Sequence, residues 1–117
     1  MLQSRKFEEL DLVFVPSNIY SQSQGTGGSP YNVLLDLAKM GAKFPLEGAG
    51  LVGQDSLGEY IVDDCKNHGI ATDMLSVSPG TSTSYTDVMT ERDGGRRTFF
   101  HNRGANATWD GSEIDFN

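Results

Sequence analysis

The apolar and polar positions of this chain change period along its length, and the changes predict strands and helices in alternation. A mostly apolar run at 10–15 predicts a strand, and a run of small residues at 46–52 predicts a second, buried one. Apolar residues at helical spacing predict helices over 30–40 and 56–68. A short strand is expected over 74–77. Strands that alternate with helices are typical of a parallel α/β layer.

The ends of the two expected helices carry recognisable start and stop residues. Gly41 and Gly69 each follow a helix at the position where a left-handed backbone favours glycine. Ser56 is expected to cap the second helix in a capping box with Glu59. Asp55, just before it, is interpreted as a structural residue favoured by the helix dipole rather than as a catalyst.

The later part of the chain predicts a β-hairpin. Two strands, over 82–91 and 96–102, are rich in Thr, Tyr, Val and Phe. The turn Arg92-Asp93-Gly94-Gly95 joins them, and both of its central positions can take a positive φ. The two strands are polar enough for at least one face of the hairpin to be exposed to solvent. The hairpin is therefore expected to project from the parallel layer as a second, smaller sheet.

Composition limits the classes of partner. The chain has 117 residues, enough for one domain, and a net charge of −7, which disfavours nucleic acid. No apolar run approaches the roughly 20 residues of a membrane span, so no membrane partner is expected. A single cysteine, Cys65, allows no internal disulfide and fits a reducing cytoplasm, the expected location. Cys65, His68 and His101 lack the spacing of a zinc site, and no metal ligand is assigned.

The segment Gly27-Gly28-Ser29-Pro30-Tyr31-Asn32 opens the first helix and carries the strongest chemical signal. Two glycines let the backbone approach a ligand closely, and Pro30 suits the first turn of a helix. The free N–H groups of that turn point toward whatever lies on the loop. Asn32 adds an amide that both donates and accepts. The sequence therefore predicts a site for a polar small molecule.

A second glycine motif suggests a different function. Gly48-Ala49-Gly50-Leu51-Val52-Gly53 matches G-x-G-x-x-G, and Asp73 lies 20 residues beyond it. These glycines are expected inside a strand, whereas a dinucleotide site needs them after one. A dinucleotide-binding oxidoreductase fragment is therefore kept only as the less favoured alternative.

Several motifs in series resemble the ribokinase-like (PfkB) carbohydrate kinases over about positions 25–108. They are Gly27-Gly28-Ser29-Pro30-Tyr31-Asn32, Leu37-Ala38-Lys39-Met40-Gly41, Val52-Gly53-Gln54-Asp55-Ser56-Leu57-Gly58, Asn67-His68-Gly69-Ile70-Ala71-Thr72 and the segment 81–106. The resemblance implies a three-layer α/β sandwich, present here in part, with a small β-sheet lid. It also implies ATP-dependent phosphorylation of a sugar or sugar-like alcohol, with ATP and Mg²⁺ as cofactors.

The resemblance also implies roles for individual residues. Gly27, Gly28 and Asn32 would bind sugar hydroxyls, and Asn106 lies where the family chain returns from the lid toward the substrate. The lid would comprise segments at about 10–24 and 82–103.

The hairpin is expected to contact both sugar and partner. Phe99 and Phe100 are adjacent in a strand and point to opposite faces, so one would meet the sandwich or the sugar and the other solvent or a second lid in a homodimer. His101 faces either solvent or the sugar. Phe100 and His101 are the lid residues assigned to possible substrate contact.

The chain departs from the family pattern in one important respect. The family's catalytic base is an Asp in a Gly-x-Gly-Asp motif, whereas Gly48-Ala49-Gly50 is followed here by Leu51. No catalytic residue is assigned, and neither are nucleotide-binding residues. Residues 1–117 are therefore expected to form one partial domain, the N-terminal, sugar-side portion of such a kinase, inactive in isolation. A catalytically silent sugar-binding or dimerisation module is the alternative.

Overall fold

The computed structural model describes residues 19–112, 114 and 115. The strand expected over 10–15, and with it most of the first lid segment, lies outside these residues. In the part of the chain that is described, no helix has the length and apolar character that a membrane span requires.

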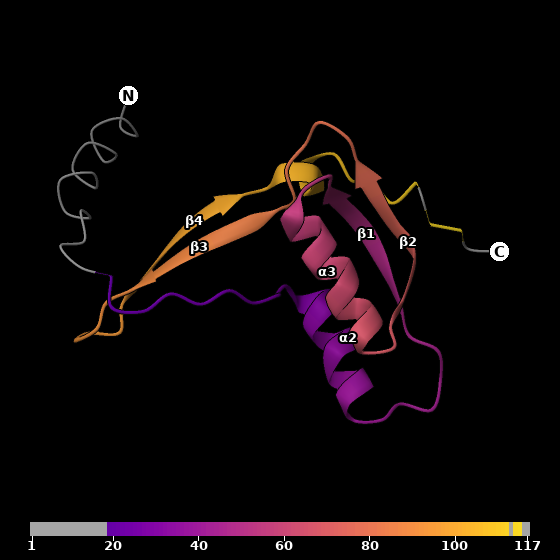
Figure 1. Ribbon diagram of the computed structural model, residues 1–117, viewed down its shortest axis with the longest axis horizontal. Helices are drawn as coiled ribbons and strands as arrows, with labels where there is room; N and C mark the ends of the chain where they lie inside the picture. The colour runs from indigo at the N-terminus through magenta and orange to yellow at the C-terminus, as the bar shows by residue number, and fades with distance from the viewer. Residues whose placement is uncertain (1–18, 113, 116–117) are drawn as a thin grey trace.

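Two parallel strands and two helices form an α/β layer. Strands β1 (Glu47–Gly53) and β2 (Ala71–Ser78) pair in parallel, with Val52 opposite Val77. Helices α2 (Ser29–Lys39) and α3 (Ser56–Asn67) lie together on one side of the two strands (Figure 1). The prediction of helices alternating with parallel strands is confirmed, with β2 longer than expected.

Gly48 of β1 is buried and faces apolar side chains of the core. A Cβ there would make ordinary contacts, at 3.8 Å with Leu34 of α2 and at 3.9 Å with Ile70. The described residues that are buried and apolar are Val52, Cys65, Ile70 and Ala105. The core therefore lies between the helices and the strands and reaches to the short helix after the hairpin.

Both predicted helix stops are confirmed, but the predicted start of α3 is wrong by one residue. Gly41 and Gly69 have φ of 73° and 70°, as glycine at these positions permits. The N-cap of α3 is Asp55, whose Oδ1 accepts from the Gly58 N–H at 2.9 Å. Ser56 already has a helical backbone, because Asp55 takes the capping position one residue earlier.

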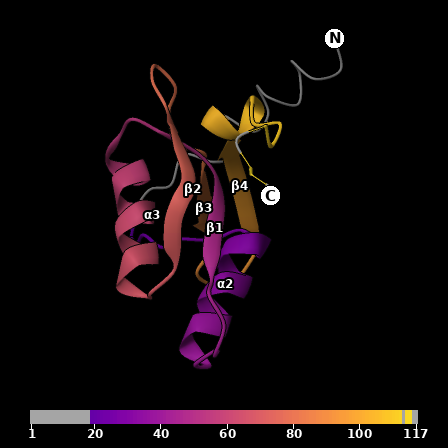
Figure 2. The same cartoon turned by 90° about the vertical axis from the view of Figure 1, so that its right-hand side faces the viewer.

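The hairpin forms a second sheet that projects away from the α/β layer. Strands β3 (Tyr85–Thr90) and β4 (Arg97–Asn102) pair antiparallel, with Val88 opposite Phe99 and Asp87 opposite Phe100. Figure 2 shows β1 and β2 side by side in front and the hairpin behind them. The expected projection of a separate sheet is confirmed.

The turn of the hairpin differs from the prediction. Of its two glycines only Gly95 has a positive φ, of 64°. The Glu91 N–H donates to the Arg96 carbonyl at 2.8 Å, and the Gly95 N–H donates to the Glu91 carbonyl at 3.0 Å. These bonds close a loop that is longer than a two-residue turn, and only its last residue needs a left-handed backbone.

Thr83 joins the hairpin to the α/β layer. It is 2% exposed, and its hydroxyl donates to Asp55 Oδ1 at 2.5 Å and accepts from the Gly53 N–H at 2.9 Å. The Thr83 N–H donates to Asp55 Oδ2 at 2.7 Å. One carboxylate therefore caps α3 and holds the chain that leads into β3.

The same junction is packed backbone against backbone. A Cβ at Gly53 would lie 2.4 Å from the Thr81 carbonyl oxygen, and one at Gly104 would lie 2.2 Å from that of Ser82. Gly104 opens the 3₁₀ helix η1 (Gly104–Ala107), and the next N–H, of Ala105, donates to the Ser82 carbonyl at 2.8 Å. The chain therefore enters and leaves the hairpin through one tightly closed junction, which we call the hairpin junction: Gly53, Asp55, Thr83 and Gly104.

We predict that Gly53→Ala lowers the free energy of unfolding by about 2 kcal/mol or more, because the added methyl meets backbone atoms that cannot turn away. Gly50→Ala is the matched control in the same strand. Its Cβ would make an ordinary contact of 3.6 Å with Leu75, so we expect a change within about 1 kcal/mol. Urea unfolding of both variants measures the difference, and equal midpoints would contradict the prediction.

Candidate functional site

The glycine loop before α2 is open to a ligand. Gly28 is the N-cap residue of α2 with a φ of 97°, and Gly27 and Gly28 both have nothing within 4 Å of the position a Cβ would take. No side chain caps this end of α2. Pro30 has no N–H, so the backbone N–H groups of this turn that are free to donate to an external acceptor are those of Ser29 and Tyr31.

Asn32 stands in the first turn of α2 with its side chain exposed. Its N–H donates to the Gly28 carbonyl at 2.9 Å, which is the first hydrogen bond of the helix. The structure thus brings Gly27, Gly28 and Asn32 together at one helix end, as the sequence predicted for a small-molecule site. Their contact with a ligand stays a prediction.

One carboxylate on α3 holds both ends of this loop. Thr26 Oγ1 donates to Asp64 Oδ2 at 3.3 Å, and the Tyr31 hydroxyl donates to the same oxygen. Burial and the hydrogen bond to Asp64 raise the pKa of Tyr31 well above its usual range. We did not predict this tie from the sequence, although a carboxylate on the apolar face of a predicted helix is a signal for it.

Two residues near Asp64 have structural roles. Cys65 is 1% exposed and belongs to the core; burial raises the pKa of its thiol. His68 is the C-cap of α3, and its Nδ1 lies 2.8 Å from the Asp64 carbonyl oxygen. In the described part of the chain, no group of three or more His, Cys, Asp or Glu side chains is placed to hold a metal ion.

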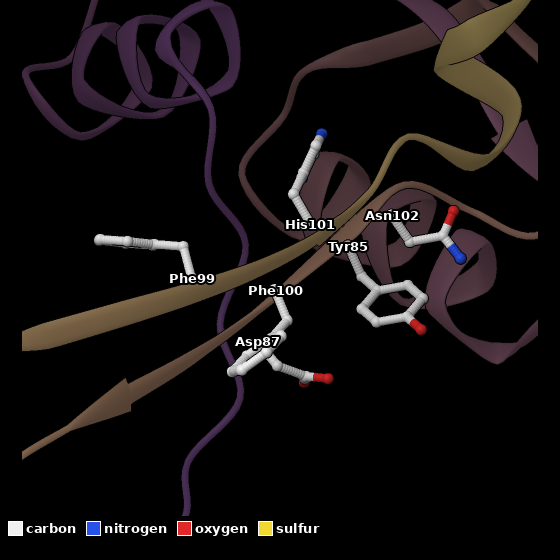
Figure 3. A pocket seen from close by; sticks show the side chains of 6 residues that line it. All are labelled: Tyr85, Asp87, Phe99, Phe100, His101 and Asn102. Atoms are coloured by element: carbon white, nitrogen blue, oxygen red, sulfur yellow. The ribbon is translucent and has the colours of Figure 1, made fainter. Parts of the chain in front are cut away.

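The hairpin carries a shallow hollow of about 330 Å³. Figure 3 shows the six side chains around it, with Phe99 and His101 on one side of the ribbon and the other four on the opposite side. Those four are Tyr85, Asp87, Phe100 and Asn102. An aromatic pair beside a carboxylate and an amide can both stack on a ring and bind hydroxyl groups.

This arrangement separates the two lid residues that the sequence assigned to substrate contact. Phe100 lies in the hollow and is 47% exposed. His101 points to the opposite face, where its Nδ1 lies 2.7 Å from Thr86 Oγ1. A ligand against one face of the hairpin therefore contacts only one of the two. Tyr85, Asp87 and Asn102 were not predicted, because their shared face depends on the strand register.

The segment before the glycine loop starts beside the hairpin turn and runs from there to α2 (Figure 1). At the hairpin turn, the Arg92 guanidinium carbon lies 4.8 Å from the centre of the Tyr20 ring. Asn106 lies apart from this segment, exposed on η1, with its N–H donating to the Arg103 carbonyl at 3.0 Å. No hydrogen bond joins Asn106 to the glycine loop among the residues described.

The second glycine motif is structural. Gly48, Gly50 and Gly53 all lie inside β1, which runs from Glu47 to Gly53. Gly53 is closed off by the hairpin junction rather than open to a ligand. A dinucleotide site needs its glycines in the turn after a strand, so the geometry disfavours that function.

Residues 10–117 match the model of the pfkB family carbohydrate kinases. This chain belongs to that family. It is 27% identical over 118 residues to a protein of Arabidopsis thaliana described as probable fructokinase-6, chloroplastic. The matched region covers 94% of this chain and 30% of that protein.

Solved structures of the family share the fold. A PfkB protein from Polaromonas sp. JS666 superposes with a TM-score of 0.70 at 21% identity, over 86% of this chain and 34% of that one. A fructokinase from Xylella fastidiosa with bound ATP gives a TM-score of 0.63 at 25% identity, over 75% of this chain and 26% of that one. The chain thus spans about a third of the length of the proteins it matches, and its ribokinase-like α/β fold, present in part, is confirmed.

Asp55 belongs to the Val-Gly-x-Asp motif that resembles the family's motif, and its role here is structural. Its hydrogen bonds from the Thr83 hydroxyl, the Thr83 N–H and the Gly58 N–H lower the pKa of the carboxyl. A low pKa and three donors suit a permanently ionised anchor rather than a proton acceptor.

We predict that Asp55 makes the folded chain sensitive to acid. Because the folded pKa lies below the ordinary value of 3.8, the contribution of this carboxylate is complete above that pH and is lost as the pH falls through the folded pKa. Asp55→Asn should remove that part of the pH dependence. Urea unfolding between neutral and acidic pH measures the slope, and identical slopes in the two proteins would contradict the assignment.

Proposed function

We propose that this chain forms the sugar-binding portion of a carbohydrate kinase that transfers a phosphate group from ATP to a hydroxyl of a sugar or sugar-like alcohol. The observation that carries the proposal is the open glycine loop at the uncapped start of α2, in a chain matched by the family over residues 10–117. Fructose and ribose are the first candidates, since relatives of this chain are described as fructokinases and ribokinases.

In this proposal the glycine loop binds and orients the sugar. The backbone at Gly27 and Gly28 approaches the ring closely, and the N–H groups of the first turn of α2 donate to hydroxyl oxygens. Asn32 contributes an acceptor and two donors, which fit the mixed character of sugar hydroxyls. Asn106 would join them from η1 once the sugar is bound.

The hairpin acts as the lid of this site. The face that carries Tyr85, Asp87, Phe100 and Asn102 offers both aromatic rings and polar groups, so it can cover a sugar and exclude water from it. Both lid segments proposed from the sequence, about 10–24 and 82–103, meet at the contact of Tyr20 with Arg92.

The nucleotide has no assigned place on the described residues. ATP would supply the phosphate group and Mg²⁺ would neutralise its charge. Neither a group of metal-binding side chains nor a Gly-x-Gly-Asp motif is present in the described part of the chain. No step of phosphate transfer is therefore assigned to it.

The other expected partners stay predictions. A homodimer through the lid is supported by the exposed face that carries Val88 and Phe99, of which Phe99 is 60% exposed. A cytoplasmic location rests on the lone thiol of Cys65, whereas the Arabidopsis relative is described as chloroplastic. A silent sugar-binding module is the second candidate, and a gene that continues into a Gly-x-Gly-Asp motif would favour the kinase over it.

We predict no turnover by the isolated 117-residue chain. With ATP, Mg²⁺ and D-fructose or D-ribose, an assay of ADP release should stay at the level of the blank, because the chain has no assigned catalytic base. A rate above the blank that depends on the sugar would contradict this prediction.

We predict that Asn32→Ala weakens sugar binding by roughly tenfold, the loss expected for about one good hydrogen bond. Isothermal titration with D-fructose and D-ribose measures the dissociation constants. Asn67→Ala is the control, since Asn67 is an exposed amide on a different helix, in the last turn of α3. If the unmodified chain binds neither sugar, the proposal fails for these substrates; if Asn32→Ala binds as well as the parent, Asn32 has no part in binding.

A further inference from the structure

Two hydroxyl groups on either side of the glycine pair converge on one oxygen atom. Thr26 precedes Gly27 and Gly28, and Tyr31 follows them. Both side chains donate to Oδ2 of Asp64, from positions 38 and 33 residues away in the chain. The loop that carries the candidate sugar contacts is therefore closed into a ring by a carboxylate of a different helix.

The loop has little else to fix its shape. Gly27 and Gly28 are exposed and have open space around them. Glycine has the most conformational freedom of any residue, so an untethered loop of this kind loses entropy when it binds a ligand. A tether that fixes the loop beforehand reduces that loss and so tightens binding.

Asp64 is itself held in place. Its side chain is 23% exposed, Oδ1 lies 3.6 Å from His68 Nδ1, and its backbone carbonyl also lies near that nitrogen. The next residue, Cys65, is buried in the core. The carboxylate therefore has a fixed position from which it can define the loop.

We propose that Asp64 is a positioning residue that holds the glycine loop, through Thr26 and Tyr31, in the shape that binds the sugar. This inference rests on the proposed function, because it assigns a role at the same site. Asp64 touches no substrate in this account and acts only through the two hydroxyls.

The test compares sugar affinity across matched variants of the full 117-residue chain. Tyr31→Phe removes only the hydroxyl, and Asp64→Ala removes the acceptor; each should weaken binding of D-fructose or D-ribose by roughly tenfold. Asp64→Asn keeps an acceptor oxygen and should restore most of the affinity. Asp63→Ala is the control, since Asp63 is an exposed acid one position earlier on the same helix.

The single cysteine supplies a second readout. The Cys65 thiol belongs to the residue after Asp64, is 1% exposed and lies close enough to Tyr31 for the two to interact. Loosening of the loop should expose this buried thiol and so speed its reaction with a thiol reagent in Tyr31→Phe and Asp64→Ala, but not in Asp63→Ala.

The outcomes separate this proposal from the proposed function. Weaker sugar binding in Tyr31→Phe and Asp64→Ala, with recovery in Asp64→Asn, supports it. Parental affinity in both variants overturns it and leaves the sugar-binding function standing. If the parent chain binds neither sugar, the proposed function fails for these sugars. Faster thiol labelling in the variants would then show that the hydrogen bonds to Asp64 only support the structure, and the positioning role would also be overturned.

Discussion

The carboxylate of Asp55 is the group on which the arrangement of this chain depends. It caps α3 and accepts two hydrogen bonds from Thr83, so the α/β layer and the hairpin are connected through one side chain. Around it, glycines at 53 and 104 let three backbone segments meet at distances that no side chain would allow. A projecting hairpin with mostly exposed residues has little core of its own, so its direction is set at this junction rather than along its length.

Helix α3 therefore positions both parts of the candidate site. Its N-cap, Asp55, holds the root of the hairpin, and Asp64, near its other end, holds the glycine loop. The two acids lie on one helix packed against β1 and β2, so the glycine loop and the hairpin have a common frame. The contact of Tyr20 with Arg92 joins the far ends of the same two parts. The pfkB family supplies the chemical context, and this frame gives a physical reason why the candidate site can keep its shape.

The sequence predicted the features that local interactions determine. Gly41 and Gly69 end their helices through their own backbone freedom, and the two arms of the hairpin are rich in residues that favour strands. The features that it missed depend on pairs far apart in the chain. Thr83 and Asp55 are 28 residues apart, and nothing in the local pattern at either position shows that they meet. The hollow on the hairpin was missed for the same reason, since Phe100 and Asn102 share a face with Tyr85 only in the observed register. The turn was mispredicted because composition permits a positive φ at Gly94 without requiring it.

The most direct test of this account is a double-mutant cycle between Asp55→Ala and Thr83→Val, measured by urea unfolding at neutral pH. The cycle cancels the loss of the helix cap in Asp55→Ala and leaves the energy shared by the two residues. We predict a coupling of about 1 kcal/mol or more, as expected for hydrogen bonds to a carboxylate. Losses that add to within about 0.3 kcal/mol, the usual result for independent positions, would show that the junction does not join the hairpin to the layer in this way.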